Sequence, residues 1–172
     1  MNKYLPDIYK KSIFDINYKK LKKENIKCLI FDLDNTIAKI DSLEVDDKTI
    51  DLINNLKQDF TVLLVSNSPK KRVKNFLDKL NIDGYYFALK PSTRTLKKII
   101  SKYNLSNKNI AIIGDQFITD MGYGYKGKIK KIFVDPIATK DLKITNINRY
   151  LENKIMTKYS KKDLFKKGEY YE

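Results

Sequence analysis

Two aspartates stand directly after a continuous apolar run in the first third of the chain. Residues 28–31 (CLIF) have the pattern of a buried strand, and Asp32 and Asp34 follow them. Side chains alternate along a strand, so carboxylates two residues apart share one face. Such anions repel each other unless a cation lies between them. The spacing therefore favours a site at which the two carboxylates bind a cation. For this pair alone, the alternative is a helix cap or an Asx turn.

The residue types that are missing narrow the chemistry further. The chain has no histidine and a single cysteine, Cys28. This excludes Ser-His-Asp and Cys-His nucleophiles and all His-ligated metal sites. Catalysis must use carboxylates, lysines and hydroxyls, together with a hard cation such as Mg²⁺, which takes oxygen ligands. One buried cysteine forms no internal disulfide, and this indicates a reducing compartment.

Polar side chains also follow the other apolar runs. Ser66 and Asn67 come after the run at 60–65, Lys90 ends the segment 84–90, and Asp115 ends the segment 109–115 with Asp120 close behind. Each feature alone has an ordinary explanation as a turn, a cap or a solvated side chain. In a parallel sheet, however, ligands bind outside the carboxyl ends of the strands. We therefore expect these side chains to meet at one edge.

The elements that must position these residues alternate between strands and helices. Strands are expected at 27–33, 60–67, 84–90, 109–115 and 129–135, and helices at 46–58, 69–81, 92–104 and 145–160, with a short helix within 117–125. This order predicts an α/β fold, with a Rossmann-like, mainly parallel sheet of about five strands flanked by helices. At 172 residues we expect one domain. Residues 1–26 form an N-terminal extension that packs on the core, and 160–172 are a candidate flexible tail.

The chemistry of these residues is that of phosphoryl transfer. Asp32 can attack phosphorus as a nucleophile, and Asp34 can protonate the leaving oxygen and later accept a proton from water. Lys90 can neutralise the developing negative charge. Asp115, with Asp120 as a further candidate, would complete an oxygen shell for Mg²⁺ beside Asp32.

The phosphate itself is expected at the start of the helix over 69–81. Ser66, Asn67 and nearby backbone N–H groups can hold the phosphoryl oxygens, and the helix adds the positive end of its dipole. Ser68 is expected to cap that helix. The spacing around the site leaves no room for a cap domain, because a helix follows Asp34 within about a dozen residues and only one helix and one strand fit before Lys90.

With these motifs in order, the chain resembles the haloacid dehalogenase (HAD) phosphatase superfamily. The matching motifs are DLDNT at 32–36, VSN at 65–67, KP at 90–91 and GDQFITD at 114–120. The resemblance implies the roles given above for Asp32, Asp34 and Asp115. It also implies that Asp34 ligates the metal through its backbone carbonyl. Thr36 and Asp120 would support the site, Asp120 by holding the metal or orienting Lys90.

A longer stretch resembles the YqeG-type subfamily, which is related to mitochondrial phosphatidylglycerophosphate phosphatases. The likeness rests on the residues before DLDNT and on the late segment TNINRYLE at 145–152. It implies hydrolysis of a phosphate monoester, with a phospholipid head group as a candidate substrate. GYGYKGK at 122–128 departs from the Gly-Gly-Asn-Arg run usual in that family, and Lys126 stands as the candidate replacement for its Arg.

Charge and hydropathy suggest the partners. The formal net charge is +14, and residues 61–100 carry nine basic side chains against two acidic ones, which favours an anionic substrate. Residues 1–27 carry eight Lys against three acids, interspersed with six apolar residues that could touch an anionic membrane or pack on the sheet: Tyr4, Leu5, Ile8, Ile13, Phe14 and Ile16. We expect a cytoplasmic protein, peripheral to a membrane at most, or one of an organellar matrix if the source is eukaryotic.

Three other classes of protein compete with this interpretation. A receiver domain would need a phospho-accepting Asp where Lys90 stands. A catalytically decayed HAD-fold binding module stays open as the minority alternative, because all the proposed catalytic side chains are present. A phosphatase of nucleic-acid ends or nucleotides stays open, although the arginine-rich tracts with interleaved aromatic residues that bind single strands are missing and no dedicated nucleic-acid binding is expected.

Overall fold

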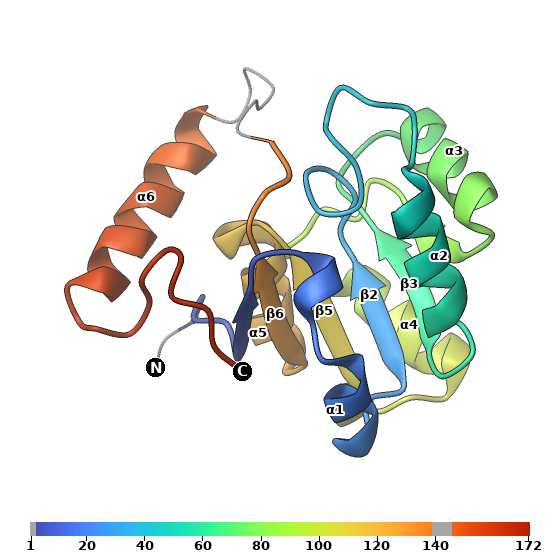
Figure 1. Ribbon diagram of the computed structural model, residues 1–172, viewed down its shortest axis with the longest axis horizontal. Coiled ribbons are helices and arrows are strands. Elements are labelled where there is room, and N and C mark those ends of the chain that lie inside the picture. Colours follow the sequence, from blue (N-terminus) through green and yellow to red (C-terminus); the bar gives the residue numbers. More distant parts are fainter. Residues whose placement is uncertain (1–2, 139–145) are drawn as a thin grey trace.

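The computed structural model describes residues 3–138 and 146–172 (Figure 1). Within them, six parallel strands form one sheet in the order β1-β6-β5-β2-β3-β4. The strands are β1 (Ile8–Lys10), β2 (Cys28–Phe31), β3 (Thr61–Val65), β4 (Asp83–Tyr85), β5 (Ile110–Gly114) and β6 (Lys130–Val134). The α/β class is thus confirmed. The strand beyond the five expected is β1, which is three residues long, too short to show a strand pattern in the sequence.

Helices connect the strands. The α-helices are α1 (Tyr18–Lys23), α2 (Asp47–Leu56), α3 (Lys70–Leu80), α4 (Arg94–Tyr103), α5 (Gly122–Gly127) and α6 (Asn146–Ser160). Short 3₁₀ turns are η1 (Ile13–Asp15) and η2 (Asn107–Asn109), and η3 (Phe117–Met121) is one π-helical turn. Thr145, the expected first residue of the last helix, lies outside the described residues. No helix among the described residues is long and apolar enough to cross a bilayer.

The two faces of the sheet bury separate cores. On one face, α1, α2 and α3 pack on side chains such as Leu29, Phe31 and Leu64, and on the other, α4 and α5 pack on Ile30 and Ile112. In Figure 1 the first group lies in front of the sheet and the second behind it. Alternate residues of β2 face opposite cores, which is why its sequence is a continuous apolar run.

The N-terminal segment is part of the sheet and its core. Ile8, Ile13 and Ile16 are each at most 5% exposed. Tyr4 and Leu5 pack against an aromatic cluster that contains Tyr9. Of the six apolar residues proposed to touch a membrane, Phe14 alone is exposed. The packing alternative is therefore the correct one for this segment, because its apolar side chains are needed to cover β6.

The end of the chain also packs on β1. Tyr9 and Tyr171 exchange backbone hydrogen bonds of 2.9 and 3.0 Å in an antiparallel bridge. Phe165 is buried, and its ring lies 4.7 Å from that of Tyr9. Against the expectation of a flexible tail at 160–172, Phe165 is buried and Tyr171 half-buried beside the edge strand.

The chain order makes the position of the site unambiguous. From β2 the chain runs outward through β3 to β4, returns to β5 on the other side of β2, and continues to β6. The crevice between β2 and β5 is the switch point at which open α/β sheets bind ligands. No cap domain covers it within residues 3–138, because the stretch from β2 to α2 is a loop and the stretch from β3 to Lys90 holds α3 and β4.

Candidate active site

The carboxyl ends of β2 and β5 place two aspartates side by side. Asp32 is the first residue after β2, and its backbone N–H donates to the carbonyl of Ile113 in β5 at 2.9 Å. Asp115 is the first residue after β5. Both are buried at this edge of the sheet. The convergence expected from the strand ends is present.

A buried lysine joins this pair to a third carboxylate. Lys90 Nζ donates to Asp32 Oδ1 and to Asp120 Oδ1, both at 2.6 Å. The Lys90 side chain is 1% exposed and that of Asp120 is fully buried. Lys90 is not the last residue of a strand, since β4 ends at Tyr85 and a loop carries the chain onward. Its place in the site therefore depends on that loop.

The pKa values reflect the crowding of negative charge. Burial raises the pKa of Asp32 to about 7, against the opposing effect of Lys90, and Asp120 adds to the rise. Burial, followed by repulsion from Asp32 and Asp120, raises the pKa of Asp115 well above its usual value. Burial alone lowers the pKa of Lys90, but its contacts with Asp120 and Asp32 outweigh this effect. One ammonium does not balance three carboxylates.

This excess of buried carboxylates suits a divalent cation. One oxygen from each of Asp32, Asp115 and Asp120 lies within 4.8 Å of the others. Thr36 Oγ1 donates to Asp115 Oδ1 at 3.3 Å, and the backbone N–H of Gln116 donates to Asp120 Oδ2 at 3.2 Å. The cluster is made of hard oxygen donors held by neighbouring groups. The cluster could therefore hold a divalent metal, and Thr36 contacts it through Asp115.

Asp34 lies beside this cluster and has different partners. Its carboxylate accepts hydrogen bonds from Arg72 Nε at 2.8 Å and from the Ser68 hydroxyl. Arg72 also donates to the carbonyl of Ser42 at 2.6 Å. Ser68 makes no side-chain cap on α3, so the expected cap is corrected: its hydroxyl is used by Asp34. The side chains of Asp32 and Asp34 thus have separate environments despite their spacing.

Sequence reasoning missed Arg72 as a site residue. It is one of only three arginines in a chain with 35 basic residues, and it stands in the helix that follows Ser66. An arginine kept in a chain so rich in lysine could have indicated this role. Its guanidinium presents a fork of N–H donors, which lysine cannot replace.

Ser66 and Asn67 follow β3 at the same edge. Ser66 is buried, and its hydroxyl accepts a hydrogen bond from the backbone N–H of Ser68 at 3.1 Å while keeping its own proton to donate. The Asn67 amide bonds the backbone of Lys90 in both directions, at 2.7 and 3.1 Å. The Asn67 side chain therefore positions Lys90, and the phosphate-binding role expected for this residue stays a prediction.

Lys126 does not join the site. It is exposed in the last turn of α5. The next residue, Gly127, accepts a hydrogen bond through its carbonyl from the side chain of Asn107, just before β5 begins. Lys126 is therefore at the amino end of the sheet, opposite the aspartates. The expected supporting role is corrected, since α5 runs back along the sheet and carries this residue away.

The family of the chain follows from comparison with known proteins. A family model described as mitochondrial PGP phosphatase matches residues 1–137. The chain belongs to this phosphatase family. A curated relative, the probable phosphatase YqeG of Bacillus subtilis, is 34% identical over 160 residues, which cover 92% of this chain and 93% of the relative. The YqeG-type resemblance is thus confirmed.

Solved structures show the same fold at low identity. The putative HAD hydrolase YfnB of Bacillus subtilis, bound to magnesium, is 14% identical with a TM-score of 0.56, covering 70% of this chain and 91% of that one. A putative 3-deoxy-D-manno-octulosonate 8-phosphate phosphatase of Vibrio cholerae is 15% identical with a TM-score of 0.52, covering 64% and 66%. This member of the PGP phosphatase family thus has a HAD-type fold, with a buried aspartate cluster that could hold a divalent metal.

Proposed function

We propose that this phosphatase hydrolyses a phosphate monoester through an aspartyl-phosphate at Asp32, with Mg²⁺ as cofactor. The observation that carries the proposal is the cluster itself. Asp32 contacts the Lys90 ammonium at 2.6 Å, and one of its oxygens lies within 4.8 Å of oxygens of Asp115 and Asp120. Asp34 lies outside that cluster at the mouth of the site. A nucleophile and an acid/base with separate environments are what a two-step hydrolysis requires.

In the first step, Asp32 attacks phosphorus and the bond from phosphorus to the leaving oxygen breaks. Asp34 supplies a proton to that oxygen, so the alcohol leaves neutral. Lys90 holds Asp32 in place and offsets the charge on the phosphoryl oxygens, while Ser66 donates its hydroxyl proton to one of them. In the second step, Asp34 takes a proton from water, which attacks phosphorus and releases inorganic phosphate and Asp32.

The carboxylates of Asp32 and Asp115 would hold the Mg²⁺, with the backbone carbonyl of Asp34 as the further ligand implied by the resemblance and Asp120 close enough to support them. When bound, the cation supplies charge neutralisation that lets carboxylate and phosphate approach each other. Its fit is supported by the raised pKa of Asp32 and of Asp115, which is caused first by burial and then by repulsion from neighbouring carboxylates.

For the substrate, we propose a phospholipid head-group phosphate such as phosphatidylglycerophosphate. The description of the matching family, a PGP phosphatase, supports it. So does the open site, since no cap domain in residues 3–138 encloses a small molecule. An uncapped site accepts a phosphate attached to a bulky group.

A substrate panel tests the proposal. Hydrolysis of short-chain phosphatidylglycerophosphate, 5′-phosphorylated oligonucleotides, nucleotides and glycerol 3-phosphate is compared by kcat/KM with Mg²⁺ and with a chelator. We expect the lipid phosphate to be preferred by about tenfold or more, which is the scale of one or two added contacts. A preference for nucleotide or oligonucleotide phosphates would contradict the proposed substrate while leaving the mechanism intact.

The mechanism has its own test in Asp32→Asn, which keeps the shape and removes the attacking charge. We expect kcat to fall by about 10³-fold or more while thermal unfolding shows an intact fold. Asp83→Asn is the matched control, since Asp83 is exposed on β4 and pairs with Lys102 on the surface. Near-normal turnover by a folded Asp32→Asn protein would overturn the assignment.

A further inference from the structure

The loop between β4 and Lys90 exposes large apolar side chains beside the active site. Tyr86, Phe87 and Leu89 are 42%, 56% and 65% exposed, whereas Ala88 between them is buried. The next residue is Lys90, which holds Asp32. The apolar side chains therefore stand at the mouth of the site rather than at a remote surface.

The protein holds this loop in a costly backbone conformation. Phe87 and Leu89 have φ values of 43° and 54°, in the left-handed region that large side chains rarely adopt. The backbone N–H groups of Phe87 and Ala88 donate to the carbonyls of Ser68 and Ser66 at 3.1 and 3.0 Å. The loop is thus tied to the segment proposed to bind phosphate. Its exposed apolar side chains are presented in a fixed arrangement.

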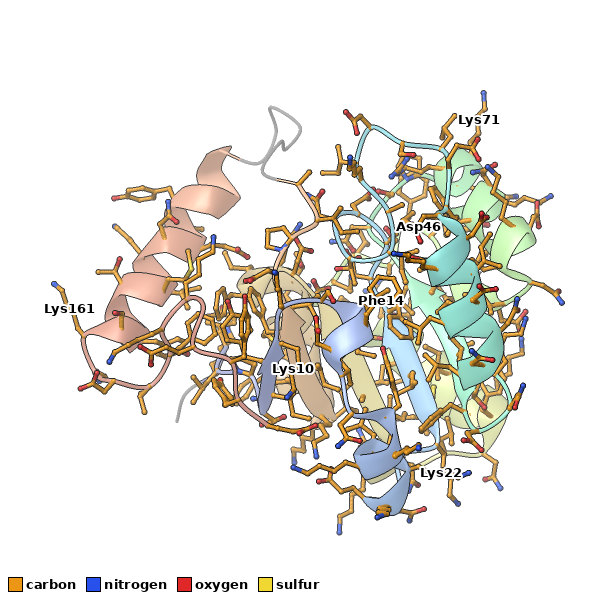
Figure 2. The ribbon with its side chains drawn as sticks, in the orientation of Figure 1. Lys10, Phe14, Lys22, Asp46, Lys71 and Lys161 are labelled. Atoms are coloured by element: carbon orange, nitrogen blue, oxygen red, sulfur yellow. The ribbon has the colours of Figure 1, made fainter. Side chains whose placement is uncertain are left out.

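Basic side chains surround the loop on the α3 side. Lys70 Nζ lies 5.6 Å from the centre of the Tyr86 ring, and Lys71 and Arg94 are exposed at the first turns of α3 and α4. Figure 2 shows Lys71 at the upper end of α3, pointing away from the rest of the molecule. Residues 66–77 and 84–101 contain no acidic side chain. The apolar loop therefore stands in a positively charged surface.

The loop between β2 and α2, which α3 contacts through Arg72 and Lys79, has the other sign. The loop between β2 and α2 exposes Asp41, Glu44 and Asp46. A negatively charged surface would therefore meet residues 86–89 and the first turns of α3 and α4 first, and would be repelled by the acidic loop, where Lys79 pairs only with Glu44 among these three acids. This asymmetry would orient the molecule with residues 86–89 leading.

We propose that residues 86–89, called here the interfacial loop, dock the enzyme on an anionic lipid bilayer. Phe87 and Leu89 enter the head-group region with Tyr86 at its border, and Lys70, Lys71 and Arg94 contact lipid phosphates. The inference rests on the proposed lipid substrate, to which it adds the means of access. A lipid phosphate next to the loop is next to Lys90 and Asp32. Nucleic acid fits less well, because Leu89, the most exposed of the three, has no ring to stack on a base.

The test replaces the apolar side chains without straining the backbone. Phe87→Asn with Leu89→Asn suits the left-handed conformation, which asparagine tolerates better than phenylalanine or leucine. The matched control is Tyr150→Gln with Leu151→Gln, an exposed apolar pair on α6 that also stands near lysines. Figure 2 shows Lys161, at the end of α6, on the opposite side of the molecule from Lys71. A second variant, Lys70→Gln with Lys71→Gln, tests the charge separately.

Co-sedimentation is measured with vesicles of phosphatidylcholine alone and of phosphatidylcholine with phosphatidylglycerol, at low and high salt. We expect the unaltered protein to bind the anionic vesicles, and the Asn pair to lower the partition by about tenfold or more. The Lys pair should remove most of the salt-sensitive part of the binding. The α6 control should bind as the unaltered protein does.

Several outcomes would overturn the inference. These are binding to neither vesicle, equal binding by the Asn pair with an unchanged melting temperature, or loss of binding in the α6 control instead. Binding of a single-stranded oligonucleotide that depends on the loop, without vesicle binding, would assign the surface to nucleic acid. A dimer in solution that the Asn pair dissociates, again without vesicle binding, would assign it to a second copy of the chain.

Monomeric short-chain phosphatidylglycerophosphate separates this inference from the proposed function. The Asn pair should hydrolyse it at the rate of the unaltered protein, since it needs no bilayer. Hydrolysis without vesicle binding would overturn only the docking role of the interfacial loop. If the unaltered protein hydrolyses none of it, the proposed substrate fails whatever the vesicles show.

Discussion

Asp32 shows how the surroundings of one residue decide its chemistry. A carboxylate that is almost inaccessible to water is costly as an anion, and burial raises its pKa to about 7. The contact with Lys90 at 2.6 Å already limits this rise, and the cation proposed beside Asp115 would restore the charged, nucleophilic form. Asp34, two residues away, is held instead by Arg72 and Ser68. Adjacent carboxylates can therefore serve as nucleophile and as acid/base.

A prediction at this scale concerns Gly114, the last residue of β5. A Cβ at this position would collide with the carboxylate of Asp120, which cannot retreat because Lys90 holds it. We expect Gly114→Ala to lower stability by about 1–3 kcal/mol, as overpacking does, and to displace Asp120 from Lys90. Activity should fall by about tenfold or more, measured as kcat/KM at a temperature well below unfolding.

Gly127→Ala is the control for that variant. Its new Cβ would meet the flexible end of Leu96, near the amino end of the sheet. It should lower the melting temperature without reducing kcat/KM at low temperature. If Gly114→Ala behaved in the same way, Asp120 would not need its present position for catalysis.

At the scale of the elements, α3 organises one side of the site. Arg72 joins Asp34 to the loop before α2 by donating to the carbonyls of Ser42 and Lys39, at 2.6 and 3.0 Å. Lys79 holds Leu43 in the same loop through its carbonyl at 2.8 Å. A helix whose first turn lies beside Ser66 thus also fixes Asp34, the proposed acid/base, and the loop before α2. Its contribution is positional, since these contacts are made by side chains along its length.

We predict that Arg72→Lys lowers kcat by about tenfold and changes KM much less. Lysine has a single charged nitrogen, so it cannot bond Asp34 and the loop carbonyls together. Arg72→Ala should lower kcat further than Arg72→Lys does. The check is steady-state kinetics with a water-soluble phosphomonoester, with Lys74→Ala on an exposed position of the same helix as control. A fall in melting temperature with unaltered kcat would show that Arg72 serves stability alone.

At the scale of the whole molecule, the carboxylate cluster proposed to bind metal joins three separate parts of the fold. Its carboxylates come from the ends of β2 and β5 and from η3, and Lys90 arrives from the loop after β4. Repulsion among them therefore acts against the packing of strands that are distant in the chain. A bound cation should stabilise the fold as a unit.

We predict that saturating Mg²⁺ raises the melting temperature by about 5 °C or more relative to the protein with chelator. The cation must displace protons from carboxyl groups whose pKa is raised, Asp32 to about 7. Binding should therefore strengthen as pH rises through that value, and the shift should be larger at pH 8 than at pH 6. Asp115→Asn should reduce it. An identical melting temperature with Mg²⁺ and with chelator at both pH values would contradict a metal site.

The residues of the cluster could be predicted from the sequence because parallel strands end at one edge of a sheet. A run such as CLIF predicts a strand that is buried on both faces. A polar residue directly after such a strand lies at the carboxyl edge of the sheet. Asp32, Ser66 and Asp115 follow their strands in this way. The sequence also pointed to Lys90, although as the end of a strand, whereas it stands in a loop beyond β4.

Only the tertiary structure decided what depends on contacts between distant segments. The link from Asn67 to Lys90, the pairing of Arg72 with Asp34 and the remoteness of Lys126 follow from loop and helix directions that no local pattern encodes. The sequence alone did not show whether the apolar residues of the N-terminal segment and those of 86–89 are buried or exposed. Those at the N-terminus cover β6, while those at 86–89 stay exposed. Burial is a property of what packs on a side chain, and a one-dimensional pattern does not contain the partner.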